Sequence, residues 1–257
     1  MRSQLGIPQR LLSRDVLSTL LALAAITLLC WWYLVDMAID MSRIPMAGMM
    51  TFQAWTPDYF VMMLLMWVIM MIAMMVPSAT PMILLYRRVA SFNQLPGANL
   101  GTWLFVAGYL TIWTVFSLVA TTLQWLLEAL AVLTPMMKSQ NALFSGVVLI
   151  LTGLYQWSPL KEACLRHCRG PLAFVTSHWR PGLAGAWRMG LEHGGYCVGC
   201  CVLLMALLFV GGIMDLAVIA LIAILVLLEK VLPGGRLLAR VLGSLAIALG
   251  LGVMLWG

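Results

Sequence analysis

Apolar stretches long enough to cross a membrane recur along the chain, with short polar segments between them. A hydrocarbon core of about 30 Å takes about 20 residues of apolar helix. Seven stretches come close to this length, over residues 16–35, 59–80, 101–123, 141–157, 197–212, 214–230 and 237–256. The pattern predicts an all-α fold, a polytopic transmembrane helical bundle of about seven spans, in which residues 1–257 form a single integral membrane domain.

The polar segments between the stretches predict one tight turn and one longer loop. Only Gly211, Gly212 and Asp215 divide the fifth and sixth stretches. The two together would be too long for one span, so a helical hairpin is expected there. Residues 158–195 form the longest polar connection. We expect this connection to be a cytoplasmic loop. It is too short to form a separate domain with a core of its own.

A short helix is predicted within this loop. Ser158 is a good N-cap, Pro159 fits a first helical turn, and Gly170-Pro171 is a typical stop signal. The helix between these signals carries two cysteines and a histidine.

Composition and charge support membrane insertion and predict an orientation. Hydrophobic residues make up 63% of the chain and charged residues only 9%, against about 25% charged in soluble proteins. The net charge of +6 is spread between the apolar stretches, so binding to nucleic acid is not expected. With the N-terminus in the cytoplasm and the C-terminus outside, 13 of the 15 Lys and Arg residues fall inside. Only Arg43 and Lys138 fall outside.

Methionine is unusually frequent, with 20 residues in the chain. At 100° per residue, five methionines of the second stretch fall within an arc of about 120°. They are Met62, Met63, Met66, Met70 and Met74. Two interpretations are open. Methionine packs well in apolar interiors, and a row of thioethers would also form a path for a soft cation, chiefly Cu(I).

The segment before this stretch is rich in methionine and aspartate. It contains Asp36, Met37, Asp40, Met41, Met46, Met49 and Met50. Such a loop would suit the capture of copper outside the cytoplasm, although an amphipathic segment lying on the membrane surface is an alternative. After the methionine row, Pro77 and Pro81 predict either a simple kink or a broken helix that lines a site.

Two cysteine clusters have the same spacing. Cys197, Cys200 and Cys201 would share one face of a helix that opens the fifth span, with Met205 one turn further on and His193 just before them. In the short loop helix, Cys164, His167 and Cys168 repeat the spacing. Thiolates, thioethers and imidazole are ligands of soft and borderline metals, so these clusters are candidate metal sites near the cytoplasmic face.

Glu229 and Lys230 end the sixth stretch. Ionisable residues at a membrane edge are often functional. Snorkelling of both side chains towards water, with local pairing, is an equally reasonable interpretation.

Three segments together resemble a known family. They are Trp67–Pro81 (W-x6-AMMVP-x3-P), Tyr155–Pro171 (Y-x5-K-x2-CL-x2-CRGP) and Gly195–Met205 (G-Y-C-x-G-C-C-x3-M). The chain resembles a bacterial domain-of-unknown-function family of predicted metal-binding integral membrane proteins, some of which are labelled copper chaperones. Val202 stands where that family often has Trp. The resemblance implies metal binding and a multi-pass protein of the bacterial inner membrane.

The leading hypothesis is a metal-binding membrane protein that handles copper, chiefly Cu(I), or delivers it to a membrane partner such as a membrane-bound copper enzyme or other complex subunits, with the direction of transfer left open. The candidate ligands are Cys197, Cys200, Cys201, Cys164, Cys168, His167, His193, Met205, Met74, Met70, Met66 and Met62. Two alternatives stay open, a membrane thiol–disulfide oxidoreductase and a structural accessory subunit of a membrane enzyme complex. The sequence has no nucleotide-binding motif and does not favour an enzyme, and membrane lipid is the other expected partner.

Overall fold

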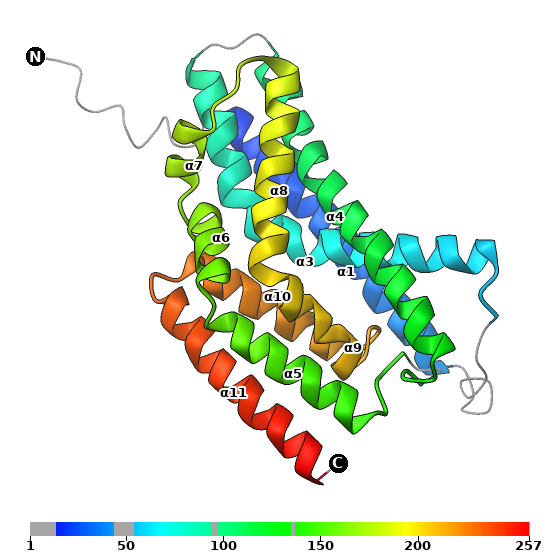
Figure 1. Cartoon of the computed structure of the whole chain (residues 1–257). Coiled ribbons are helices and arrows are strands. Elements are labelled where there is room, and N and C mark those ends of the chain that lie inside the picture. The colour runs from blue at the N-terminus through cyan, green and yellow to red at the C-terminus, as the bar shows by residue number, and fades with distance from the viewer. Residues whose placement is uncertain (1–13, 44–53, 94–96, 135–136, 257) are drawn as a thin grey trace, which may run out of the picture.

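The computed structural model describes residues 14–43, 54–93, 97–134 and 137–256. Within these ranges the fold is all-α, as predicted, and an isolated bridge between Leu133 and Ser139 is the sole β-type pairing. The helices are α1 (Arg14–Arg43), α3 (Pro57–Phe92), α4 (Ala98–Ala129), α5 (Ala142–Gln156), α6 (Pro159–Arg169), α7 (Pro171–Ser177), α8 (Gly182–Ala206), α9 (Leu208–Gly211), α10 (Leu216–Val231) and α11 (Gly235–Trp256) (Figure 1).

Several of these helices are long and apolar enough to cross a membrane. In the described ranges, five candidate spans pass this test: α1 as far as Asp40, α3, α4, α8 together with α9, and α11. A sixth is reached if α5 and α6, which bend by 64° at their junction, count as one span. Each of the seven predicted stretches is helical, the fifth being divided between α8 and α9, but α5 has only 15 residues and α10 only 16. The structure therefore supports a multi-helix membrane protein without fixing seven spans.

The sequence signals that predicted the start and end of α6 and the turn before α10 are found at those places in the structure. The Ser158 hydroxyl accepts a hydrogen bond from the Lys161 amide (3.1 Å), Pro159 lies in the first turn, and α6 ends before Gly170. Between α9 and α10 the chain turns at Gly212, whose φ of 116° disfavours any residue with a side chain. Asp215 then caps α10. The predicted short helix and turn are both confirmed.

The start of α8 differs from the prediction. The helix begins at Gly182, fifteen residues before the predicted 197, so much of the segment predicted as the loop 158–195 is helical. Its glycines serve packing. A Cβ at Gly190 would overlap the Phe105 carbonyl, and one at Gly108 would overlap the Trp187 carbonyl. These glycines allow the backbones of α4 and α8 to approach closely, as small residues do between membrane helices.

Helix α3 is longer than predicted and contains both internal prolines. Figure 1 shows it changing direction along its length. Pro77 has no N–H, which leaves the Ala73 carbonyl without its helical donor. The Trp31 indole of α1 donates to that carbonyl (3.2 Å). The broken hydrogen bond is thus replaced by a contact between helices.

Helix α1 also runs further than predicted, to Arg43. Asp36, Met37 and Asp40 therefore lie on a helix rather than in the predicted outer loop. Met46, Met49 and Met50 lie outside the described residues.

Helices α5 and α11 lie side by side (Figure 1). Gly153 and Gly243 meet at their contact, where a Cβ on either glycine would press against the other's carbonyl oxygen. This pairing places the start of α11 next to the junction of α5 and α6.

Gly190→Ala should destabilise the protein, and Gly195→Ala should not. A Cβ at Gly190 overlaps α4 backbone, whereas one at Gly195 meets no atom within 4 Å. We expect the first change to cost about 1–3 kcal/mol, and the second to leave stability equal or to raise it by up to about 1 kcal/mol. Thermal unfolding in detergent micelles measures both. Equal unfolding temperatures would contradict the close α4–α8 contact.

Candidate functional site

The three cysteines of α8 form one buried group. Cys197, Cys200 and Cys201 are all buried on one face, as their spacing predicted. The thiols of Cys200 and Cys201 both donate to the Cys197 carbonyl, at 3.1 and 2.9 Å. The Cys197 thiol interacts with both of their thiols. This turn of α8 therefore presents three sulfur atoms to its neighbours.

Helix α6 brings a fourth thiol to this group. The Cys168 sulfur lies 3.9 Å from that of Cys200 and also interacts with Cys197. We refer to Cys168, Cys197, Cys200 and Cys201 as the thiol cluster. All four are free thiols. The two cysteine-bearing helices that the sequence identified separately thus meet at one place.

The distance between the Cys168 and Cys200 sulfur atoms suits a soft metal, although the described cysteines do not form a complete metal site. Metal–sulfur bonds of about 2.3 Å in tetrahedral geometry separate two sulfur atoms by about 3.8 Å, close to the Cys168–Cys200 distance of 3.9 Å. Among the described residues, no group of three or more His, Cys, Asp and Glu side chains is arranged to hold a metal ion. Binding would require thiols now turned to the Cys197 carbonyl to rotate.

A lysine and a tyrosine contact the central sulfur atom. Lys230 Nζ lies 3.0 Å from Cys197 Sγ and also donates to the Ser78 hydroxyl (2.9 Å). The Tyr109 hydroxyl lies 3.1 Å from the same sulfur and 3.3 Å from the Met75 carbonyl. A positive charge beside a thiol stabilises the thiolate. Sequence reasoning missed Tyr109 and Ser78, because neither belongs to a motif of metal ligands.

The neighbouring Glu229 is buried in an ion pair. Its carboxylate lies 2.7 Å from Lys161 Nζ and accepts from the Gln156 amide at 2.9 Å. The Lys161 ammonium also donates to the Gln156 side-chain oxygen. Glu229 and Lys161 are each only 2% exposed. The interpretation of Glu229 and Lys230 as residues that snorkel to water is therefore wrong, since both are held inside the protein.

The remaining predicted ligands on α6 and α8 lie beside the thiol cluster. Cys164 is half-buried, and a Cβ at Gly199 would lie 2.8 Å from its sulfur. The His167 ring stacks on Tyr196 at 4.1 Å. Its Nδ1 is hydrogen-bonded to the Ala163 carbonyl (2.9 Å). Its Nε2 takes no part in that hydrogen bond.

His193 is buried among aromatic rings. It stacks with Phe105 and Tyr109, and the edge of Phe174 also meets it. Its Nδ1 is buried and has no partner within the described part of the chain. Met205, on the same helix, is fully buried. An unpaired imidazole nitrogen one turn before Cys197 is a possible further donor.

The methionines of α3 are divided by their surroundings. Met66, Met70 and Met74 are buried, whereas Met62 is half-exposed on the outer surface. Met63 is buried as well, so four of the five methionines of the predicted row lie inside the protein. Tyr109 bridges the Met75 carbonyl and Cys197 Sγ, so the inner end of the row lies at the level of the thiol cluster. Tyr109 of α4 and Lys230 of α10 thus link α3 to α8, a connection that the sequence alone did not show.

A second polar chain, which sequence reasoning missed, lies towards the other end of α3. The Gln124 side-chain oxygen accepts from the Trp67 indole (2.8 Å), and its amide donates to Glu128 (2.9 Å). The other Glu128 oxygen accepts from the Trp55 indole (2.8 Å). The Gln124 amide also lies 3.8 Å from Met63 Sδ. This chain fixes α3 against α4.

Comparison with known proteins agrees with this geometry. A family model described as copper chaperone (PpoB2) matches residues 64–253. The chain belongs to the PpoB2 copper chaperone family. The matched region includes both cysteine-bearing helices and the buried methionines, and it leaves out α1. The search of curated proteins and the search of solved structures gave no match. Membership confirms the resemblance and supports copper handling in general terms.

Lys161→Met should destabilise the protein strongly. It would leave the Glu229 carboxylate buried without its cation, at a cost of about 3–5 kcal/mol. The double variant Lys161→Met with Glu229→Gln removes that charge and should recover much of the loss. Thermal unfolding in detergent measures both.

The exposed ion pair Arg180–Glu192 provides the control for this prediction. Its side chains are 45% and 30% exposed, so Arg180→Met should cost less than about 1 kcal/mol. Similar losses for Arg180→Met and Lys161→Met would contradict a buried Lys161–Glu229 pair.

Proposed function

We propose that this protein binds Cu(I) within the bacterial inner membrane and passes it to a membrane-bound copper enzyme or another complex. The observation that carries the proposal is the convergence of Cys168 of α6 on Cys197, Cys200 and Cys201 of α8. Thiolates select soft cations such as Cu(I). Family membership points to the same metal.

The charges around the cluster suit this cargo. Two or three thiolates around one Cu(I) carry net negative charge, and a buried charge needs a partner. Lys230, in contact with Cys197, supplies it. Glu229, the chain neighbour of Lys230, is paired with Lys161, so its carboxylate does not offer a competing oxygen ligand for hard cations.

The buried methionines of α3 provide a row of uncharged thioether ligands towards the thiol cluster. Met66, Met70 and Met74 follow one another along α3 at intervals of about one turn. Thioethers bind Cu(I) without a charge of their own, so an ion could exchange from one to the next inside an apolar bundle. With the cytoplasmic N-terminus that the Lys and Arg distribution favours, this row would lead from the outer side towards the thiol cluster.

Serine substitutions in the cluster test copper binding. The protein is purified in detergent under anaerobic conditions, loaded with Cu(I), and assayed by elemental mass spectrometry and chelator competition. We expect near-stoichiometric copper in the wild type, and its loss in the triple variant Cys197→Ser/Cys200→Ser/Cys201→Ser. Cys168→Ser alone should weaken affinity by at least about tenfold, because a lost thiolate ligand removes more than about 1.4 kcal/mol.

Cys30→Ser is the matched control for these variants. Cys30 lies alone on α1 and takes no part in the thiol cluster, so copper binding should be unchanged. Absence of copper from loaded wild-type protein would overturn the proposal. Copper retained by the triple variant, together with loss of disulfide exchange, would instead support a thiol–disulfide oxidoreductase.

Methionine-to-leucine changes separate a copper path from simple packing. Leucine keeps the apolar volume but removes the sulfur donor. Met70→Leu and Met74→Leu should slow the filling of the thiol cluster with Cu(I), whereas Met62→Leu, at a half-exposed position, should not. Stopped-flow loading of protein in lipid nanodiscs measures the rates. Unchanged rates in all three variants would show that the methionines only pack.

A further inference from the structure

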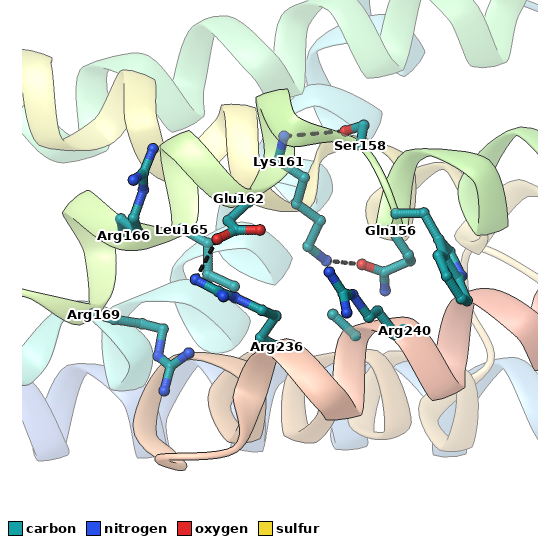
Figure 2. Close-up of a pocket in the computed structure, with 11 residues that line it drawn as sticks. Gln156, Ser158, Lys161, Glu162, Leu165, Arg166, Arg169, Arg236 and Arg240 are labelled. Atoms are coloured by element: carbon teal, nitrogen blue, oxygen red, sulfur yellow. Dashed lines mark hydrogen bonds and ion pairs between the residues drawn. The ribbon is translucent and has the colours of Figure 1, made fainter.

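A cationic pocket lies between α6 and the beginning of α11 (Figure 2). Five basic residues line it: Lys161, Arg166, Arg169, Arg236 and Arg240. Arg236 and Arg240 are one turn apart on α11 and therefore project from the same side of that helix. The pocket is distinct from the thiol cluster, although both use α6.

The charges of this pocket are only partly balanced. Lys161 pairs with Glu229, and Arg236 pairs with Glu162. Arg169 donates to the carbonyls of Leu232 and Pro233, which are neutral. Five cations thus face two carboxylates in the described part of the chain, so three positive charges are left without a counter-charge.

One of these cations is held over an aromatic ring. The Arg240 guanidinium lies 5.8 Å from the centre of the Trp157 ring. This contact orients the side chain without neutralising it. Figure 2 shows Arg236 paired with Glu162 and the Lys161 ammonium bonded to Gln156 in the same pocket. The site is thus positively charged and partly ordered before any ligand binds.

The surface around the pocket is apolar and exposed. Trp157, Leu160 and Leu237 are 56%, 62% and 69% exposed. Exposed apolar side chains beside a basic pocket are typical of the boundary between lipid tails and headgroups, where tryptophan is also enriched. A ligand that matches both features has an anionic head and an apolar tail.

We propose that this pocket binds the phosphate of an anionic phospholipid. The planar guanidinium groups of Arg236 and Arg240 suit bidentate contacts to phosphate oxygens. The lipid would join α6 to α11 on the side of α6 away from α8. Since α6 also carries Cys168, the same lipid would help to hold that thiol in the cluster. Lipid binding does not depend on whether the cluster carries copper.

The test compares lipid binding to the full-length protein in detergent by native mass spectrometry. Phosphatidylglycerol, phosphatidylcholine and inorganic phosphate are the probes. We expect retained phosphatidylglycerol in the wild type and a loss on the order of 30-fold in affinity for Arg236→Gln/Arg240→Gln, since each of the two basic residues contributes a factor of about five near a membrane. Arg236→Lys/Arg240→Lys keeps both charges and should retain most of the binding.

Arg88→Gln/Arg188→Gln is the matched control, because it removes the same charge at two exposed arginines outside the pocket. It should bind phosphatidylglycerol as the wild type does. Equal retention of phosphatidylcholine, or unchanged binding by the Arg236/Arg240 glutamine variant, would overturn the proposal. Displacement of the lipid by millimolar inorganic phosphate would assign the pocket to free phosphate instead. Helix content measured by circular dichroism confirms that each variant is folded.

Discussion

Two adjacent buried residues of opposite charge hold the centre of this protein together. Glu229 at the end of α10 binds Lys161 of α6 and Gln156 of α5, and Lys230 binds Ser78 of α3 and Cys197 of α8. A charge inside an apolar bundle is costly unless it is paired and hydrogen-bonded. Four helices must therefore dock against the end of α10. The position of α6 beside α8, and so of Cys168 beside Cys200, follows from this requirement.

The same requirement shapes the chemistry that the thiol cluster can support. Three of its four cysteines are buried, the Lys230 ammonium contacts one of their sulfur atoms, and the Glu229 carboxylate is already paired with Lys161. Hard divalent cations need several oxygen ligands and retained water, which this environment does not offer. A soft monovalent ion needs only a few sulfur donors. Buried sulfur atoms beside a carboxylate that is already paired therefore form an environment of the kind that soft ions prefer.

Local signals predicted much of this architecture. Spacing alone placed Cys197, Cys200 and Cys201 on one face, and the Ser158 cap and the Gly212 turn lie where the sequence indicated. The sequence predicts the start of α8 too late, at residue 197 instead of Gly182. The glycine-rich segment between them is compatible either with a loop or with a helix that packs closely against another helix. Only the structure, which places the α4 backbone next to Gly190, shows that this glycine lies at a helix contact.

Partners brought from distant parts of the chain could not be predicted. Tyr109 reaches Cys197 across 88 residues of sequence and Lys230 reaches Ser78 across 152, and nothing local to either residue indicates its partner. The depth of Glu229 and Lys230 was undecided for the same reason, since snorkelling and burial leave the same sequence pattern at the end of a helix.

The contact between Trp31 and the Ala73 carbonyl has a consequence for how the protein is made. Ribosomal synthesis delivers the N-terminal part of a chain first, so α1 is in the bilayer before Pro77 emerges. An unsatisfied carbonyl among lipid tails costs several kcal/mol, but here the indole that satisfies it is already in place. Although α1 lies outside the family-matched region, it supplies the hydrogen bond that α3, the methionine-bearing helix, lacks at Pro77.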